Sequence, residues 1–227
     1  MMLIATTVAS VLIASITSAA GAPAASSPAV PPMIVNVSAP GISPQLVKAV
    51  LAETDAIWRS SGVTFVWRNA PAAAASPARA GVDAIVTSVP NTLRLTIGES
   101  RGASREGYLP LGWILFNDGT VPEQEIYLSY ANARAMMEEA RGVVGIINEM
   151  PLAQRETLLA RAMGRAFAHE LGHYLLASKM HTPRGLMKAV LTAVELFMPD
   201  TSAFRIEPAQ RRAVAARLRG EAVVAMR

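Results

Sequence analysis

The chain has 227 residues, of which 52% are hydrophobic and 17% are charged. This length suits one domain of ordinary size, and the apolar content is high enough to bury a core, which excludes a disordered, highly charged protein. The net charge of +4 is small, and no basic motif is interleaved with aromatic residues, so we expect no nucleic-acid partner. The absence of cysteine excludes disulfides, thiolate metal ligands and cysteine nucleophiles.

Residues 1–20 have the character of an export signal. An apolar run over residues 2–20 ends in small residues at 18–20 that suit a cleavage site, although no Lys or Arg precedes it. An uncleaved anchor is the alternative, because about 19 residues come close to spanning a bilayer. The serines and threonines make the run a poor permanent span, so we expect a secreted or periplasmic protein without stable membrane insertion after cleavage. Residues 21–32 then form a Pro/Ala/Ser linker.

The folded domain begins with a strand–helix–strand pattern. Residues 33–39 form one β-prone run and residues 63–67 form a second. Between them, Ser43 suits an N-cap, Pro44 suits the first helical position, and the helical pattern stops at Gly62. A short crossover of this kind predicts parallel pairing of the two strands.

The next segments predict further strands. Residues 93–97 alternate as a strand does, and the apolar runs 111–116 and 125–130 flank the turn signal at 118–119. The pattern predicts a hairpin or a nearby pair of strands. The run that starts at residue 125 suits either an edge strand that pairs with an extended peptide or ordinary sheet core.

Three helices are predicted in the remainder of the chain. Residues 131–142 form a short one, residues 208–220 form a closing one, and the longest runs from Pro151 to about residue 176 or 177. One side of the long helix is expected to face solvent because it carries Arg155, Arg161 and Arg165. With no internal repeat and no second boundary, residues 33–227 are expected to form a single domain.

All three histidines of the chain lie in the stretch HELGHYLLASKMH, which starts at His169. His169 and His173 are four residues apart on the predicted helix, so their imidazoles share one face and can hold one Zn²⁺ ion. Glu170 follows the first histidine and can reach a water at the metal without binding the metal itself. This arrangement is typical of a general base that acts on zinc-activated water.

The third metal ligand has to come from beyond the helix, because a catalytic zinc normally takes three protein ligands. His181 is the best candidate; Glu195 is an alternative, and Asp200 is a weaker one. In a continuous helix His181 would lie about 18 Å from His169 along the axis, out of reach. The spacing therefore predicts that the chain turns back between the helix and His181.

The stretch HELGHYLLASKMHTPRGLM resembles the active-site region of zincin metallopeptidases, and specifically of the metzincins. The resemblance implies His169, His173 and His181 as zinc ligands, Glu170 as the base, and Met187 as the methionine of a turn beneath the metal. It also implies an α+β, zincin-like fold with a mixed, mostly parallel sheet packed against the active-site helix. A C-terminal helix would complete this fold, and substrate would lie along an edge strand.

The chain departs from the metzincin pattern in the return from the helix. The metzincin spacing would put a glycine at Leu176 and the third histidine at Lys179. Here the return is two residues longer and that glycine is absent. The stretch is also similar to secreted bacterial zincin-like proteins that share a HELGHxLL…H…GLM pattern.

The motif assigns no residue that would stabilise a developing oxyanion. Tyr174 follows His173 and would point about 100° away around the helix, so we expect it in the core. By residue type alone the candidates are Tyr108, Tyr127 and Tyr130.

Three functional hypotheses follow from the motif. The leading one is a zinc-dependent endopeptidase that acts on a peptide or protein substrate. The second is a zinc-binding or partner-binding domain without turnover, against which the intact Glu170 weighs, because a structural site needs no base. The third is a surface-anchored or secretion-related protein in which the histidines are incidental and no metal binds.

Overall fold

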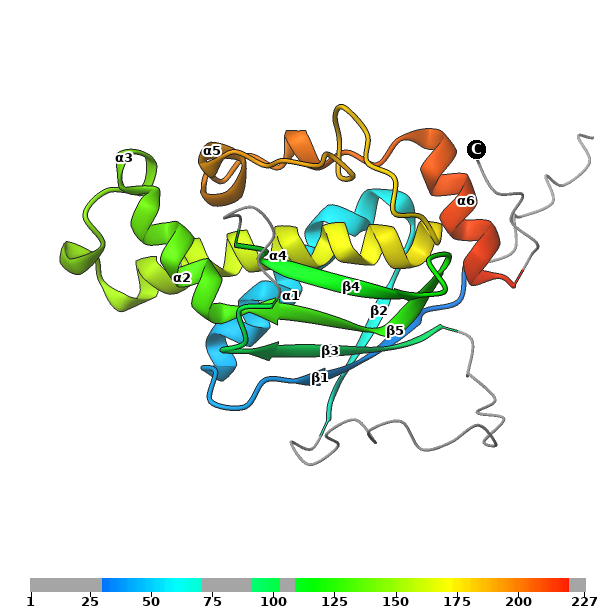
Figure 1. The fold of residues 1–227 in the computed structure, drawn as a ribbon, viewed down its shortest axis with the longest axis horizontal. Helices are drawn as coiled ribbons and strands as arrows, with labels where there is room; N and C mark the ends of the chain where they lie inside the picture. Colours follow the sequence, from blue (N-terminus) through cyan, green and yellow to red (C-terminus); the bar gives the residue numbers. More distant parts are fainter. Residues whose placement is uncertain (1–29, 71–90, 103–108, 221–227) are drawn as a thin grey trace, which may run out of the picture.

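The computed structural model describes residues 30–70, 91–102 and 109–220, which form an α+β fold around a five-stranded sheet (Figure 1). The strand order is β2-β1-β3-β5-β4. The strands are β1 (Met33–Ser38), β2 (Phe65–Asn69), β3 (Thr92–Gly98), β4 (Gly112–Asn117) and β5 (Val121–Ser129). All pairs are parallel except that β4 runs antiparallel to β5. The predicted parallel pairing of the first two strands is therefore confirmed, and the sheet is mixed and mostly parallel.

The sheet buries one face and leaves the other polar. Alternate residues of β1 and β3, such as Val35 and Leu95, are fully buried, as period-2 alternation requires. Helix α4 (Leu152–Leu176) packs on this buried face with α1 (Pro44–Trp58) beside it (Figure 1). On the other face, Arg94 and Glu125 form an ion pair at 4.0 Å.

Helices α1 and α4 cross at close range through Gly164. A Cβ atom at this position would lie 2.8 Å from the carbonyl oxygen of Val50, so any larger residue would push the helices apart. Thr54 donates its hydroxyl to the carbonyl of Gly164 at 3.0 Å, and the indole of Trp58 donates to the carbonyl of Ala168 at 3.2 Å. These contacts fix the part of α4 that leads directly into the histidine motif.

The hairpin and the helix ends agree with the sequence patterns, with small shifts. Asp118 and Gly119 between β4 and β5 both have positive φ, as a tight hairpin turn requires. Helix α1 continues as a 3₁₀ turn, and the left-handed Gly62 ends it. The predicted helix over 131–142 is divided at Ala140 into α2 (Tyr130–Glu139) and α3 (Arg141–Val144).

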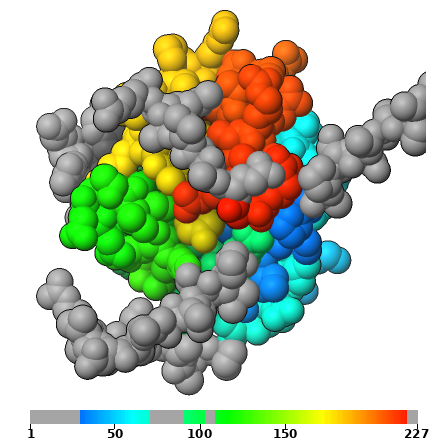
Figure 2. Space-filling model, turned by 90° about the vertical axis from the view of Figure 1, so that its right-hand side faces the viewer, coloured from blue at the N-terminus to red at the C-terminus, as the bar shows by residue number. Residues whose placement is uncertain are grey.

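Two shorter helices lie after the histidine motif. They are α5 (Ala193–Phe197) and the predicted closing helix, α6 (Pro208–Leu218). Helix α6 covers the C-terminal end of α4, where the guanidinium of Arg217 lies 5.5 Å from the ring centroid of Tyr174 (Figures 1 and 2). Tyr174 is buried, as expected.

The predicted signal peptide over residues 1–20 lies outside the described residues, as does most of the predicted linker. Among the helices of residues 30–70, 91–102 and 109–220, none combines the length and the apolar character that crossing a bilayer requires.

Candidate metal centre

Helix α4 brings His169 and His173 together one turn apart, as their spacing predicts. Their Nε2 atoms lie 3.0 Å apart and their ring centroids 4.7 Å apart. His173 is buried and His169 is half-buried. The two imidazoles therefore converge on one point at the surface of the helix that packs on the sheet.

The chain turns back at Ala177, which brings His181 to the other two histidines. Ala177 caps the helix in the left-handed conformation with φ 47°, and its N–H bonds to the carbonyls of His173 and Tyr174. The ring of the exposed His181 then lies 5.3 Å from that of His169 and 4.9 Å from that of His173. One nitrogen of each ring lies within 4.8 Å of the others, so the structure groups the three histidines that the sequence proposed.

Backbone carbonyls determine the tautomers of the two helical histidines. Nδ1 of His169 lies 2.8 Å from the oxygen of Leu186, and Nδ1 of His173 lies 2.6 Å from the oxygen of Ser178. Because a carbonyl only accepts, each Nδ1 carries the proton in these bonds, and each neutral ring has its lone pair on Nε2. Two lone pairs facing each other at 3.0 Å repel unless a cation lies between them.

The spacing of these lone pairs suits a small divalent cation. Two imidazole nitrogens at about 2.05 Å from a tetrahedral Zn²⁺ would be about 3.3 Å apart, close to the arrangement in this structure. Burial lowers the pKa of His169 to about 4 and also lowers the pKa of His173. Both rings are therefore neutral at physiological pH, which is the form that binds a metal, and their Nδ1–H bonds are the outer contacts that orient such ligands.

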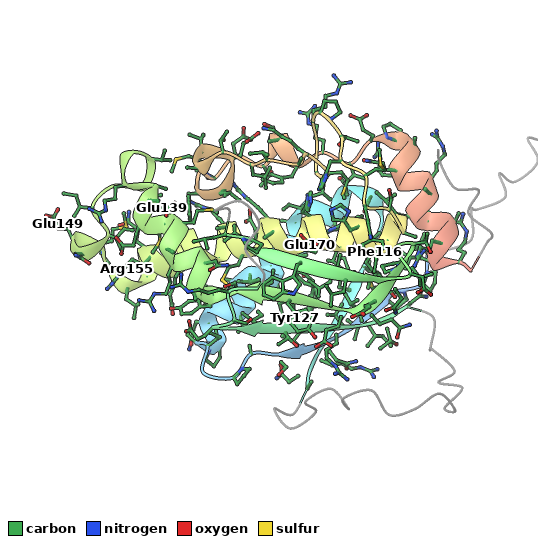
Figure 3. All side chains as sticks on the ribbon, viewed as in Figure 1. Phe116, Tyr127, Glu139, Glu149, Arg155 and Glu170 are labelled. Atoms are coloured by element: carbon green, nitrogen blue, oxygen red, sulfur yellow. The ribbon has the colours of Figure 1, made fainter. Side chains whose placement is uncertain are left out.

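Glu170 follows His169 on α4 and lies against the edge strand β4 (Figure 3). Its carboxylate accepts the backbone N–H of Ile114, and a Cβ atom at Gly112 would come within 3.1 Å of its Cγ. Burial raises the pKa of Glu170 to about 8, although the bond from Ile114 opposes this rise. Gly112 thus makes room for the Glu170 side chain, which is not among the residues grouped with the histidines.

Strand β4, and not β5, is the edge strand beside the histidines. β5 lies between β3 and β4, so the run that starts at residue 125 belongs to the interior of the sheet. Of the two interpretations of this run, sheet core is confirmed and edge strand is wrong. In the antiparallel β4–β5 pair, Ser129 donates to Leu111, so alternation directs the N–H of Ile114 away from β5 towards the open edge. A bulge between Ile114 and Phe116 follows, and the Leu115 side chain is 51% exposed there.

Met187 lies directly against the turn of α4 that joins the two helical histidines. A Cβ atom at Gly172 would be only 2.2 Å from the Met187 sulfur, so this glycine is required by the close packing of the buried methionine. The N–H of Thr182 donates to the carbonyl of Met187 at 2.8 Å and closes the loop that carries His181. Gly185, with φ +78°, lets the same loop pass the carbonyl of Arg205.

Glu195 and Asp200, the alternative third ligands, are engaged elsewhere. Both carboxylate oxygens of Glu195 accept from the Lys188 ammonium, at 2.7 and 2.9 Å, and these bonds lower the pKa of Glu195. Asp200 is exposed and accepts from the N–H and hydroxyl of Ser202. Neither carboxylate is grouped with the histidines among the described residues.

Two of the three tyrosines proposed for oxyanion stabilisation are described, and both make their contacts elsewhere. Tyr108 lies outside the described residues. Tyr127 faces away from α4, stacks on Trp113 at 5.5 Å and has its pKa raised to about 12, mainly by burial (Figure 3). Tyr130 begins α2, where its ring centroid lies 5.7 Å from the guanidinium of Arg134.

The prediction that Arg165 faces solvent is wrong. Its side chain is 0% exposed, and its Nε donates to Glu53 of α1 at 2.8 Å. Its guanidinium also donates to the carbonyl of Glu195 and lies 5.0 Å from the ring centroid of Phe204. One signal in the sequence indicates a buried Arg165: it lies four residues before His169 and therefore on the same face of the helix.

Comparison with known protein families found no family that matches this chain, and comparison with curated proteins found no match either.

Proposed function

We propose that the chain is a zinc-dependent metallopeptidase of the zincin type. The observation that supports this most is the pair of Nε2 lone pairs at 3.0 Å, whose rings are oriented by backbone carbonyls and neutral because of burial. Because each Nδ1 faces a backbone carbonyl, which can only accept, the tautomer assigned to each neutral ring leaves the Nε2 lone pair available for a cation. His181, which lies with these two rings, would supply the third nitrogen.

The residues around this point suit hydrolysis. Zn²⁺ held by three imidazoles would act as a Lewis acid and would lower the pKa of water to near neutral pH. A cation held by the histidines would lower the pKa of Glu170, so its carboxylate would then accept the proton of the attacking water and pass it to the leaving amine. Its location at the open edge of β4, and not among the ligands, supports the role of base over that of ligand.

The substrate that fits this site is a peptide in extended conformation. The outward N–H of Ile114 lies at the open edge of β4, where a peptide strand can add to the sheet. In this structure Glu170 accepts the N–H of Ile114. A carbonyl of the substrate strand would replace Glu170 as the acceptor of this N–H. The exposed Leu115 offers an apolar contact beside it.

The mixed, mostly parallel sheet, its antiparallel edge strand and the buried methionine that packs on the helix support the metzincin-like assignment. The left-handed Ala177 stands one residue after the position of the metzincin glycine and reverses the chain in the same sense. We regard the longer return to His181 as a variation on that turn.

Export through residues 1–20 is part of the same proposal and rests on the sequence pattern alone. Expression in a bacterium with the N-terminus intact, followed by N-terminal sequencing of the exported product, checks it. Cleavage near residue 20 is the expected result, and recovery of the uncleaved chain in the membrane fraction would support the anchor instead.

Metal content and the Glu170→Gln variant test the proposal together. Elemental analysis of protein purified without a histidine tag should give about one zinc per chain. Glu170→Gln should retain zinc and lower kcat/KM for peptide cleavage by about 10²–10⁴-fold. Glu156→Gln, earlier on the same helix, is the matched control and should keep full activity.

The outcomes separate the three hypotheses. Zinc binding without cleavage of any peptide in a broad library would favour the non-catalytic binding domain. Absence of zinc after reconstitution would leave the histidines incidental. Full activity in zinc-loaded Glu170→Gln would remove Glu170 from the mechanism.

A further inference from the structure

A set of polar contacts connects α1, α4 and α5 to the backbone that orients His169. Arg165 on α4 binds Glu53 on α1 at 2.8 Å and donates to the carbonyl of Glu195 on α5. The Glu195 carboxylate in turn binds the Lys188 ammonium through both oxygens. Lys188 directly follows the two residues that contact the histidine helix, so the set ends at the candidate metal centre.

The two residues before Lys188 make the contacts that matter for the metal. The carbonyl of Leu186 accepts the Nδ1–H of His169 at 2.8 Å. Met187 packs its sulfur on Gly172, and its carbonyl accepts the N–H of Thr182. A displacement of this short segment would therefore change both the orientation of the first imidazole and the floor beneath it.

Glu195 is itself held rigidly. One of its oxygens also accepts the N–H and the hydroxyl of Thr192, at 2.8 and 2.9 Å, in a capping box at the start of α5. Its backbone carbonyl is bound by the buried Arg165. Because both ends of Glu195 are held, the Lys188–Glu195 ion pair joins the segment beneath the metal to the core.

We propose that Lys188 and Glu195 form a positioning pair for the metal centre: their ion pair holds the Leu186 carbonyl on His169 and Met187 beneath Gly172. This role rests on the proposed zinc site but not on peptidase activity. Groups that orient histidine ligands from outside the coordination shell typically change metal affinity by about 10–100-fold when removed. Glu195 thus serves the metal centre without being its third ligand.

Positioning and simple electrostatics predict different signs. If only the charges mattered, removing the Lys188 cation would strengthen binding of a metal cation, whereas removing the Glu195 anion would weaken it. If the pair positions the segment, both Lys188→Met and Glu195→Gln weaken binding by about 10–100-fold. The double variant should then be no weaker than the stronger single effect, because both changes break one contact.

The experiment is a competition titration of the full-length protein and its variants with a chromophoric zinc chelator. Circular dichroism checks the fold, and the cobalt(II) absorption spectrum, which depends on ligand geometry, should shift in both single variants. The matched control is Arg184→Gln, which removes an exposed ion pair with Glu207 at 3.8 Å in the same loop. It should change zinc affinity by less than about twofold.

Equal zinc affinities in the parent protein, Lys188→Met and Glu195→Gln would overturn the positioning role, as would tighter binding in Lys188→Met. If one variant fails to fold, the other decides, because Lys188 and Glu195 are both partly exposed, at 30% and 22%. Peptidase activity is a separate readout. Zinc binding without cleavage in the parent would overturn the proposed function and leave the positioning role standing, whereas a parent without zinc would overturn both.

Discussion

The two helical histidines and the loop histidine meet at the same point, but the surrounding structure holds the helical pair more firmly than the loop residue. His169 and His173 lie on a long helix, and each donates Nδ1–H to a backbone carbonyl. His181 is exposed, and within the described part of the chain its ring contacts are with the other two imidazoles. If the three histidines bind a metal, the difference implies that two ligands are preorganised, while the third would gain its orientation from the bound ion.

The largest expected effect comes from removing one ligand of each kind. His169→Ala should weaken zinc binding by about a thousandfold, roughly 4 kcal/mol. His181→Ala should weaken it by about 10–100-fold, because the loop has to be ordered on binding and contributes less net free energy. Isothermal titration or chelator competition measures both dissociation constants. Equal losses of affinity in the two variants would contradict the difference in preorganisation between the helical and loop histidines.

The pH dependence of metal-free stability sharpens the same comparison. Burial lowers the pKa of His169 to about 4 from its ordinary value of 6.5. Between pH 6.5 and pH 4 the unfolded chain therefore binds a proton at this residue that the folded protein does not bind. This contribution stabilises the folded state above pH 6.5 and is lost as the pH falls towards 4. Partial exposure reduces it to about 2 kcal/mol.

Glu170 acts in the opposite direction, because its pKa is raised to about 8 and the folded protein binds a proton that the unfolded chain has released. The two dependences offset each other between about pH 4.5 and 6.5. Burial lowers the pKa of His173 as well, so the parent keeps part of the acid loss, and urea denaturation with chelator present should show a steeper acid loss in Glu170→Gln than in the parent. A flat profile in Glu170→Gln would contradict a buried, neutral His169.

A smaller effect is expected at Gly172, between the two helical ligands. Glycine to alanine normally stabilises a helix by about 0.5–1 kcal/mol. At Gly172 the new Cβ would meet the Met187 sulfur at 2.2 Å, so Gly172→Ala should destabilise by about 1–2 kcal/mol. Gly142→Ala in α3 has open space and should show the ordinary sign in thermal unfolding.

The smallest effect concerns the turn that leads to the loop histidine. Ala177 has φ 47°, a region that glycine occupies without strain. Ala177→Gly should therefore stabilise by about 0.5–1 kcal/mol. Ala160→Gly inside α4 is the control and should destabilise by a similar amount in the same denaturation assay.

Local patterns predicted much of the fold and the grouping of the site. The i, i+4 spacing fixes His169 and His173 on one face, and turn chemistry at Asp118 and Gly119 predicts the hairpin. The parallel pairing of β1 and β2 follows from the short crossover between them. These features depend on neighbours in the chain, which a single sequence displays.

The features that were missed depend on distant partners. The helical pattern predicts Arg165 at the surface, but its partner Glu53 lies 112 residues away in the chain. The periodicity of a single helix carries no information about such a distant partner. The left-handed Ala177 was not foreseen because alanine rarely adopts that conformation. Which strand forms the edge depends on the order in which strands join the sheet, and this is a property of the whole domain.

The bulge in β4 also limits how a second copy of the sheet could pair with this edge. A strand that offers free N–H groups to a peptide offers them equally to the edge strand of another molecule. The irregularity between Ile114 and Phe116 interrupts the row of outward-facing backbone groups after a short stretch. A segment laid along this edge could match it only locally, so the edge strand of a second copy would meet a broken register after a few residues.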